Sequence, residues 1–142
     1  MIPVVRHRSR GERLGAVPLF SSLTAKQLAS VEQLVTRVDV TAGRHLVRQG
    51  KPGGELILII DGEAEVQRDG KRVAVRGPGS FLGETALLLN RPRNASVVAV
   101  TDMTIEVIDR RAFNQLLNDH PTLYAPLLKA MANRLAELSD PI

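Results

Sequence analysis

The stretch FLGETALLLNRPRNASV, residues 81–97, is the most informative part of this 142-residue chain. Gly83 lets the main chain approach a ligand closely, and a short helix that begins at Glu84 or just after it would point unpaired N–H groups at an anion. The Glu84 carboxylate can accept a hydrogen bond from a sugar hydroxyl, and Arg93, returned by the turn before it, can pair with a phosphate oxygen. The stretch therefore predicts a site for a phosphorylated sugar.

A region rich in β-branched residues surrounds this stretch on both sides. From Thr36 to Ile108, short apolar runs alternate with turn signals, and residues 67–72 form the clearest hairpin. About eight short strands at regular spacing favour a sandwich or a barrel, so we expect an eight-stranded antiparallel β-roll, or jelly roll. The glycines of the turns are expected to have positive φ, namely Gly43, Gly50, Gly53 and Gly62.

Helical patterns stand before and after the β-rich region. Residues 24–27 form a capping box, which opens a helix with an apolar face made by Leu28, Val31, Leu34 and Val35. A second helix is predicted from Arg110, and after Pro121 a third continues at helical spacing toward the end. We therefore expect a mainly β domain over residues 17–142, with an N-terminal helix, a short helix within residues 81–97 and two C-terminal helices. Residues 1–16 are predicted to be a basic tail.

The composition limits the class of protein and its compartment. The chain has no cysteine, which excludes disulfides and thiolate metal sites and fits a reducing compartment, so we expect a cytoplasmic protein. Its longest apolar runs are far shorter than the roughly 20 residues that a membrane span requires. We therefore predict no membrane segment.

The charge of the chain is uneven. Nineteen basic and fifteen acidic residues give a formal net charge of +4, and four arginines gather at the start, at positions 6, 8, 10 and 13. Acidic lipid, nucleic acid or a partner domain could contact such a cluster, but a solvated tail is the simpler interpretation. With three Phe, one Tyr and no Trp, the chain also lacks the stacking platforms of single-strand binders.

Residues 81–97 resemble the phosphate-binding cassette of the cyclic-nucleotide-binding domain family, which includes the catabolite activator protein, kinase regulatory subunits and gated channels. The pattern is Gly-Glu, a small residue two positions after the glutamate, and an arginine nine positions after it that precedes small residues. The predicted order of helix, β-roll and two helices is also similar, over about residues 17–139. The resemblance implies a regulatory domain that binds a cyclic nucleotide and signals through movement of its C-terminal helices.

The same resemblance implies which residues contact the ligand. The main candidates are Gly83, Glu84, Thr85, Ala86, Arg93, Asn94 and Ala95. Weaker candidates are Leu82, Val73 and Val75 as walls, Arg134 as a group that stacks on a purine, and Ser139 as a hydrogen-bond partner of the base. Outside this context, Glu84 could simply cap the short helix, and Arg93 could pair with Glu84. Arg91 is expected to be a solvated loop charge.

Asn94 is a departure from the family pattern and bears on the choice of base. The family most often has Ala, Ser or Thr at this position, and threonine there is associated with a preference for cyclic GMP. The absence of threonine favours cyclic AMP as the ligand. The Asn94 amide could also donate to the phosphate or reach a guanine edge, so cyclic GMP stays open.

Other classes of function have less support from the residues. The three histidines, His7, His45 and His120, are far apart, so we expect no metal site, no cofactor and binding without turnover. After Leu138 only four residues follow, too few for a helix-turn-helix, so a truncated transcription regulator would need further sequence. The expected output is an effector domain or partner protein outside this chain. A docking module without ligand is the remaining alternative.

Overall fold

The structure is a computed structural model, and it describes residues 14–138. The four arginines of the predicted tail and Ser139 lie outside the described residues. Leu14, which falls inside the segment predicted as tail, has 1% of its surface exposed and packs in the hydrophobic core. The packed part of the chain therefore includes at least the last residues before Val17.

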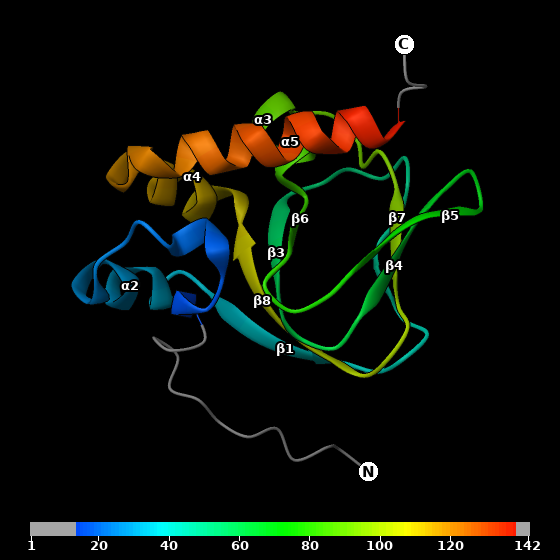
Figure 1. Ribbon diagram of the computed structural model, residues 1–142, viewed down its shortest axis with the longest axis horizontal. Coiled ribbons are helices and arrows are strands. Elements are labelled where there is room, and N and C mark those ends of the chain that lie inside the picture. The colour runs from blue at the N-terminus through cyan, green and yellow to red at the C-terminus, as the bar shows by residue number, and fades with distance from the viewer. Residues whose placement is uncertain (1–13, 139–142) are drawn as a thin grey trace.

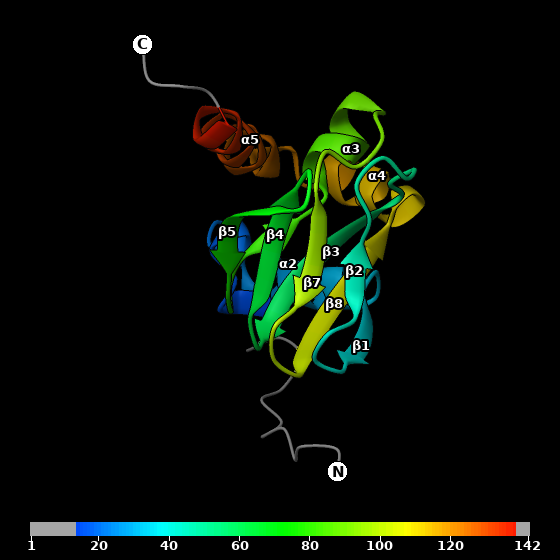
Figure 2. The ribbon, with the colours of Figure 1, turned by 90° about the vertical axis from the view of Figure 1, so that its right-hand side faces the viewer.

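Within residues 14–138, eight strands form two four-stranded antiparallel sheets, as the sequence predicted (Figures 1 and 2). The first sheet has the order β1 (Thr36–Val40), β8 (Met103–Asp109), β3 (Glu55–Asp61) and β6 (Phe81–Leu82). The second has the order β2 (His45–Val47), β7 (Ser96–Ala99), β4 (Ala64–Arg68) and β5 (Lys71–Arg76). The two sheets face each other and enclose the interior of a β-roll.

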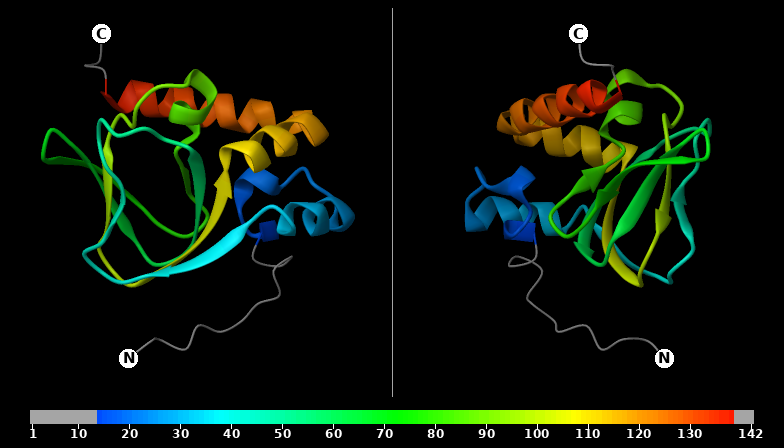
Figure 3. Two further views of the ribbon diagram at one scale, coloured as in Figure 1. Left: turned by 180° about the vertical axis from the view of Figure 1, so that it is seen from behind. Right: turned by 45° about the vertical axis from the view of Figure 1, so that its right-hand side comes forward.

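Helices cover one side and one end of this roll (Figures 1 and 3). They are η1 (Pro18–Phe20), α2 (Ala25–Glu32), α3 (Glu84–Leu89), α4 (Arg110–Asp119), η2 (Pro121–Leu123) and α5 (Tyr124–Leu138). The long helix α5 crosses the end of the roll and contacts α3. Within residues 14–138, no helix combines the length and the apolar character that crossing a membrane would require.

The predicted N-terminal helix is present but shorter than its apolar pattern indicated. The capping box is formed, because Gln27 N donates to Thr24 Oγ1 at 3.2 Å and Thr24 N donates to Gln27 Oε1 at 2.8 Å. The helix ends at Glu32, so Leu34 and Val35 lie beyond it, although Val35 is still buried. Strand β1 begins only four residues after the helix ends, and the chain must turn within that distance.

Strand β3 is buried on both faces and connects two hydrophobic cores. Leu56 and Leu58 belong to the core under the helices, whereas Ile57 and Ile59 belong to the core between the two sheets. Since successive side chains of a strand point to opposite faces, a strand covered on both sides is apolar throughout. This explains the uninterrupted apolar run that precedes Asp61.

The predicted hairpin joins β4 to β5 through a tight turn. Asp69 and Gly70 both have positive φ, 53° and 80°, which a two-residue type I′ turn requires. The β4–β5 pairing shifts register between Val66 and Gln67, and Val73 is the extra residue in β5. The turn brings the end of β4 close to the cassette, residues 81–97, where the candidate site lies.

Candidate functional site

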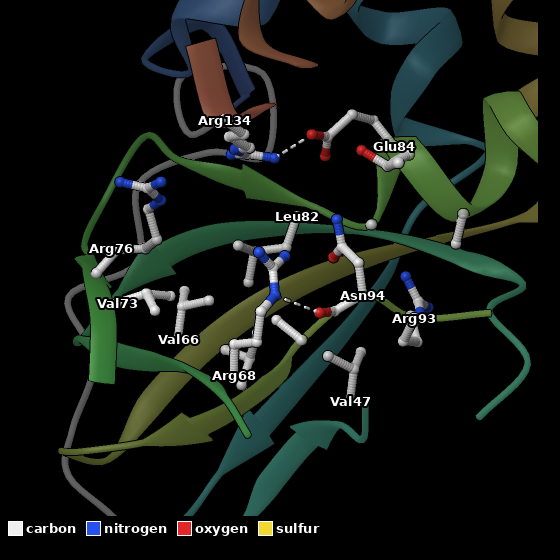
Figure 4. A pocket seen from close by; sticks show the side chains of 16 residues that line it. Val47, Val66, Arg68, Val73, Arg76, Leu82, Glu84, Arg93, Asn94 and Arg134 are labelled. Atoms are coloured by element: carbon white, nitrogen blue, oxygen red, sulfur yellow. Dashed lines mark hydrogen bonds and ion pairs between the residues drawn. The ribbon is translucent and has the colours of Figure 1, made fainter. Parts of the chain in front are cut away.

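A pocket lies between β4, β5, the cassette and α5 (Figure 4). Ten predicted site residues line it together: Val73, Leu82, Gly83, Glu84, Thr85, Ala86, Arg93, Asn94, Ala95 and Arg134. Its free volume is about 80 Å³. The fold therefore gathers residues that are up to 61 positions apart, from Val73 to Arg134, into one cavity.

Arg93 is buried within this pocket, and hydrogen bonds of both its side chain and its backbone hold it in place. Its side chain is 8% exposed, and Nη2 donates to the carbonyl oxygen of Glu55 at 3.1 Å. Its backbone N–H donates to the carbonyl of Lys51, and its carbonyl accepts from Gly50 N–H, both at 2.8 Å. Nη1 is also buried, and no residue of 14–138 gives it a hydrogen-bond partner. The pocket thus holds a cation with a buried donor nitrogen that has no partner among the described residues.

The electrostatic surroundings of Arg93 are consistent with an incomplete site. Burial lowers the pKa of the guanidinium below its ordinary value, while the carboxylates of Glu55 and Glu84 raise it and the neighbouring Arg110 lowers it further. An arginine keeps its proton in proteins even so. A bound anion would add a charge-assisted partner for the buried Nη1 of this cation.

Two glycines allow the main chain to approach Arg93. Gly83, the N-cap of α3, has a φ of 94°, and a Cβ there would overlap Arg93 Nη1 and lie 2.5 Å from the Glu55 carbonyl oxygen. Gly53 was predicted to have positive φ, and this is wrong. A Cβ on Gly53 would lie 2.6 Å from Arg93 Nε, so this position is glycine because the arginine packs directly on it.

Glu84 is the first residue of α3, and its partner comes from the other end of the chain. The Glu84 side chain is 1% exposed, and Oε1 forms an ion pair with Arg134 of α5. Arg134 also donates to the carbonyl of Phe81 and lies 5.0 Å from the centre of the Phe81 ring. The predicted alternative, a Glu84–Arg93 ion pair, is not formed among the described residues. Oε2 of Glu84 is buried, and residues 14–138 provide no partner for it.

The pocket also contains residues that sequence reasoning missed: Val47, Val66, Arg68, Ala74, Arg76 and Val97. The signal that could have found several of them is strand alternation, because Ala64, Val66 and Arg68 share one face of β4. In the second sheet, Val66 pairs with Ala74 and with Val97, which places these three side by side. Arg68 extends this inward row by a charged residue (Figure 4).

Two of the predicted site residues, Val75 and Ser139, are not among those that line the pocket. Val75 is 42% exposed and does not line the pocket, whereas Val73 is also 42% exposed but does. The register shift in β5 explains this, because Val75 pairs with Glu65 and so faces outward. Ser139 lies outside the described residues. Arg91 is exposed, in agreement with the prediction of a loop charge.

Comparison with known proteins relates the chain to a family model and to cyclic-nucleotide-dependent kinase proteins. The model of the "Cyclic nucleotide-binding domain" family matches residues 37–120, more than half of the chain. A cAMP-dependent protein kinase regulatory subunit from Schizosaccharomyces pombe is 39% identical over 107 residues, which are 75% of this chain and 26% of the relative. The cGMP-dependent protein kinase egl-4 of Caenorhabditis briggsae is 36% identical over 135 residues, with 81% of this chain and 18% of the relative covered.

Solved structures agree with the observed architecture. The structure described as cAMP-bound PfPKA-R superposes with a TM-score of 0.84 at 25% identity, and covers 90% of this chain and 44% of that one. The chain spans about a quarter of the length of the curated relatives that it matches. The match to the family model and the shared β-roll lead to one conclusion: the chain belongs to the cyclic nucleotide-binding domain family.

Proposed function

We propose that the pocket binds a 3′,5′-cyclic nucleotide, with cyclic AMP as the preferred ligand, and that the domain regulates without turnover. The observation that carries this proposal is a pair of buried, unpaired polar atoms on pocket-lining residues: Nη1 of Arg93, a donor, and Oε2 of Glu84, an acceptor. A cyclic nucleotide carries a phosphate oxygen for the first and a ribose hydroxyl for the second. One ligand would therefore satisfy both atoms.

The energetic argument follows from the burial of these two atoms. A buried donor or acceptor without a partner costs about 1 to 3 kcal/mol, and more when the group is charged. Within residues 14–138, neither Nη1 nor Oε2 recovers this cost through a protein partner. A ligand that supplies both partners gains this energy on binding, in addition to the apolar contact of its base with the pocket walls.

The Arg134 contact allows Glu84 to serve two partners at the same time. Arg134 uses only Oε1, so a ribose hydroxyl can donate to Oε2 while α5 keeps its ion pair. The guanidinium of Arg134 faces the pocket from α5, where it can also lie against a purine. We assign to Arg134 the role of connecting bound ligand to the C-terminal helix.

The size of the pocket supports movement of that helix. Its free volume of about 80 Å³ is well below the roughly 300 Å³ at which pockets for small ligands begin. We therefore expect the walls to separate when a nucleotide enters, and Arg134 holds one of them, α5, to the cassette through Glu84 and the Phe81 carbonyl. The ligand shifts the position of α5 only if it binds one position more tightly than the other.

The names of the relatives support both the ligand class and the regulatory role. The S. pombe relative is a regulatory subunit of a cAMP-dependent kinase, and the C. briggsae relative is a cGMP-dependent kinase. Cyclic AMP is preferred for this chain because Asn94 stands where threonine would favour cyclic GMP. The output then belongs to an effector domain or partner protein beyond these 142 residues, acting in the cytoplasm.

Calorimetric titration of the whole chain with cyclic AMP, cyclic GMP and linear 5′-AMP tests the proposal. We expect a dissociation constant of about 1 μM or lower for cyclic AMP. Binding of 5′-AMP should be much weaker, because its phosphate is not closed onto the ribose and so is not held toward Arg93 while the ribose hydroxyl contacts Glu84. Amide NMR shifts in residues 124–138 should change with cyclic AMP. Folded, ligand-free protein that binds neither cyclic nucleotide would contradict the proposal and favour a docking module.

A further inference from the structure

Arg68 stands at an unusual position for a charged residue. It occupies the inward-facing row of β4, after Ala64, which is fully buried, and Val66, which packs against the core between the sheets. A strand that continued this pattern would place a third apolar side chain against the ligand. The chain instead places a guanidinium in the wall of the pocket.

One bond to the cassette fixes the direction of this side chain. Arg68 Nε donates to the carbonyl oxygen of Asn94 at 3.0 Å, and Figure 4 shows the guanidinium directed into the pocket. Among residues 14–138, no group bonds to Nη1 or Nη2. These two nitrogens therefore keep up to four N–H donors for a ligand, in a planar fork.

The neighbouring hairpin holds the base of this side chain in place. Asp69 N donates to Gln49 Oε1, and Gln49 Nε2 donates to Asp69 Oδ1, both at 2.9 Å. Gln49 N in turn donates to Ser96 Oγ at 2.9 Å. Asp69, the residue after Arg68, is thus connected through Gln49 to the same segment of the cassette that Arg68 contacts. These hydrogen bonds hold the backbone from which the Arg68 guanidinium extends.

The chemistry of the pocket gives this fork a selective role. Among the described residues, four arginines line the pocket, namely Arg68, Arg76, Arg93 and Arg134. They face one carboxylate, Glu84, one oxygen of which already pairs with Arg134. Arginine only donates, and the O6 and N7 atoms of guanine are two adjacent acceptors that match its fork. Adenine presents N7 as an acceptor but an amino group in place of O6, and that group meets an arginine donor unfavourably.

We propose that Arg68 is a base-reading residue, which raises the affinity of the site for cyclic nucleotides whose purine carries O6. Arg68 thereby reduces the difference in affinity between cyclic AMP and cyclic GMP. The inference rests on the proposed function, because it assumes that a cyclic nucleotide occupies the pocket. It assigns Arg68 two separable contributions. Nε positions the Asn94 carbonyl for every ligand, whereas Nη1 and Nη2 distinguish one base from another.

Titration of the whole chain and its Arg68→Leu variant with three ligands separates these contributions. Cyclic GMP and cyclic AMP differ in the base edge, and cyclic IMP carries O6 and N7 of guanine without its 2-amino group. We expect Arg68→Leu to weaken cyclic GMP and cyclic IMP at least about tenfold more than cyclic AMP. Any loss that all three ligands share measures the positioning of Asn94.

Two further variants serve as controls. Arg72→Leu removes an exposed arginine of the adjacent strand β5, which does not line the pocket, and should leave all three affinities unchanged. Arg68→Lys keeps a positive charge but loses the fork, so it should recover only part of the affinity for cyclic GMP and cyclic IMP. Thermal unfolding of each variant establishes that the comparison is made on folded protein.

The outcomes distinguish this inference from the proposed function. If cyclic nucleotides bind and Arg68→Leu changes all three affinities by the same factor, Arg68 only positions the cassette and base reading is overturned. A larger loss for cyclic AMP than for cyclic GMP overturns it as well, as does a loss confined to cyclic GMP while cyclic IMP is unaffected. If no cyclic nucleotide binds the unsubstituted chain, the proposed function fails first.

Discussion

The two ends of the pocket are built in different ways. At the end that faces α3, Glu84 and Arg93 are buried, and main-chain groups hold Arg93 on several sides. At the opposite end, Val73 is 42% exposed. Arg134 reaches from α5 to Glu84 and so lies between the two ends. At the first end, Arg93 is held by backbone atoms of the roll. The second end is formed by side chains on separate elements.

This difference indicates how recognition and signalling are divided between the two ends. A site for a group common to all ligands can be prearranged, since nothing in it needs to change from one ligand to another. Under the proposed function, the end that meets the base and α5 must have two arrangements that differ in affinity for the ligand. We therefore expect substitutions at the buried end to abolish binding, and those at the exposed end to adjust it.

The largest effect is expected at the buried end, for Arg93→Ala. This change removes the cation that would pair with the phosphate, and it should weaken cyclic AMP binding by roughly 2 to 5 kcal/mol, measured by calorimetry. Arg91→Ala is the matched control, because Arg91 is an exposed arginine two residues away. Equal losses in the two variants, or none in Arg93→Ala, would remove Arg93 from the site.

An intermediate effect is expected where the two ends meet, for Arg134→Ala. The change leaves both carboxylate oxygens of the buried Glu84 without a partner in the described part of the chain, so it should lower the free energy of unfolding by about 1 to 3 kcal/mol. Chemical denaturation of the ligand-free protein measures this. Lys129→Ala, an exposed change on the same helix, should stay within about 0.5 kcal/mol of the unsubstituted chain. A stable Arg134→Ala variant would show that α5 is not held by this ion pair.

The smallest effect is expected at the exposed end, for Val73→Ala. Loss of two methyl groups from a partly exposed wall should weaken cyclic AMP binding by less than about 1 kcal/mol and leave stability nearly unchanged. Val75→Ala is an internal control, because Val75 lies on the same strand with the same exposed fraction but outside the pocket. An effect of Val73→Ala as large as that of Arg93→Ala would contradict the division between the two ends.

Much of the fold could be predicted because its signals are local. The Thr24 capping box, the Asp69-Gly70 turn and the short helix from Glu84 each depend on residues within a few positions of one another, and each is present. The prediction was wrong where a residue that resembles a local turn signal is explained by a contact with a distant part of the chain. Gly53 was predicted to be a turn glycine with positive φ, yet its packing partner is Arg93, forty residues further along the chain.

The same distinction applies to the candidate site. By itself, the sequence predicted the Gly83, Glu84 and Arg93 set, because these residues lie within one short segment whose spacing is visible in one dimension. The resemblance of that segment to the family cassette implied the class of ligand. Only the tertiary structure decided that Glu84 pairs with Arg134, that Val73 and not Val75 faces the pocket, and that Arg68 enters it from β4. Those contacts depend on strand register and on the path of α5, which are fixed by packing between segments far apart in the chain.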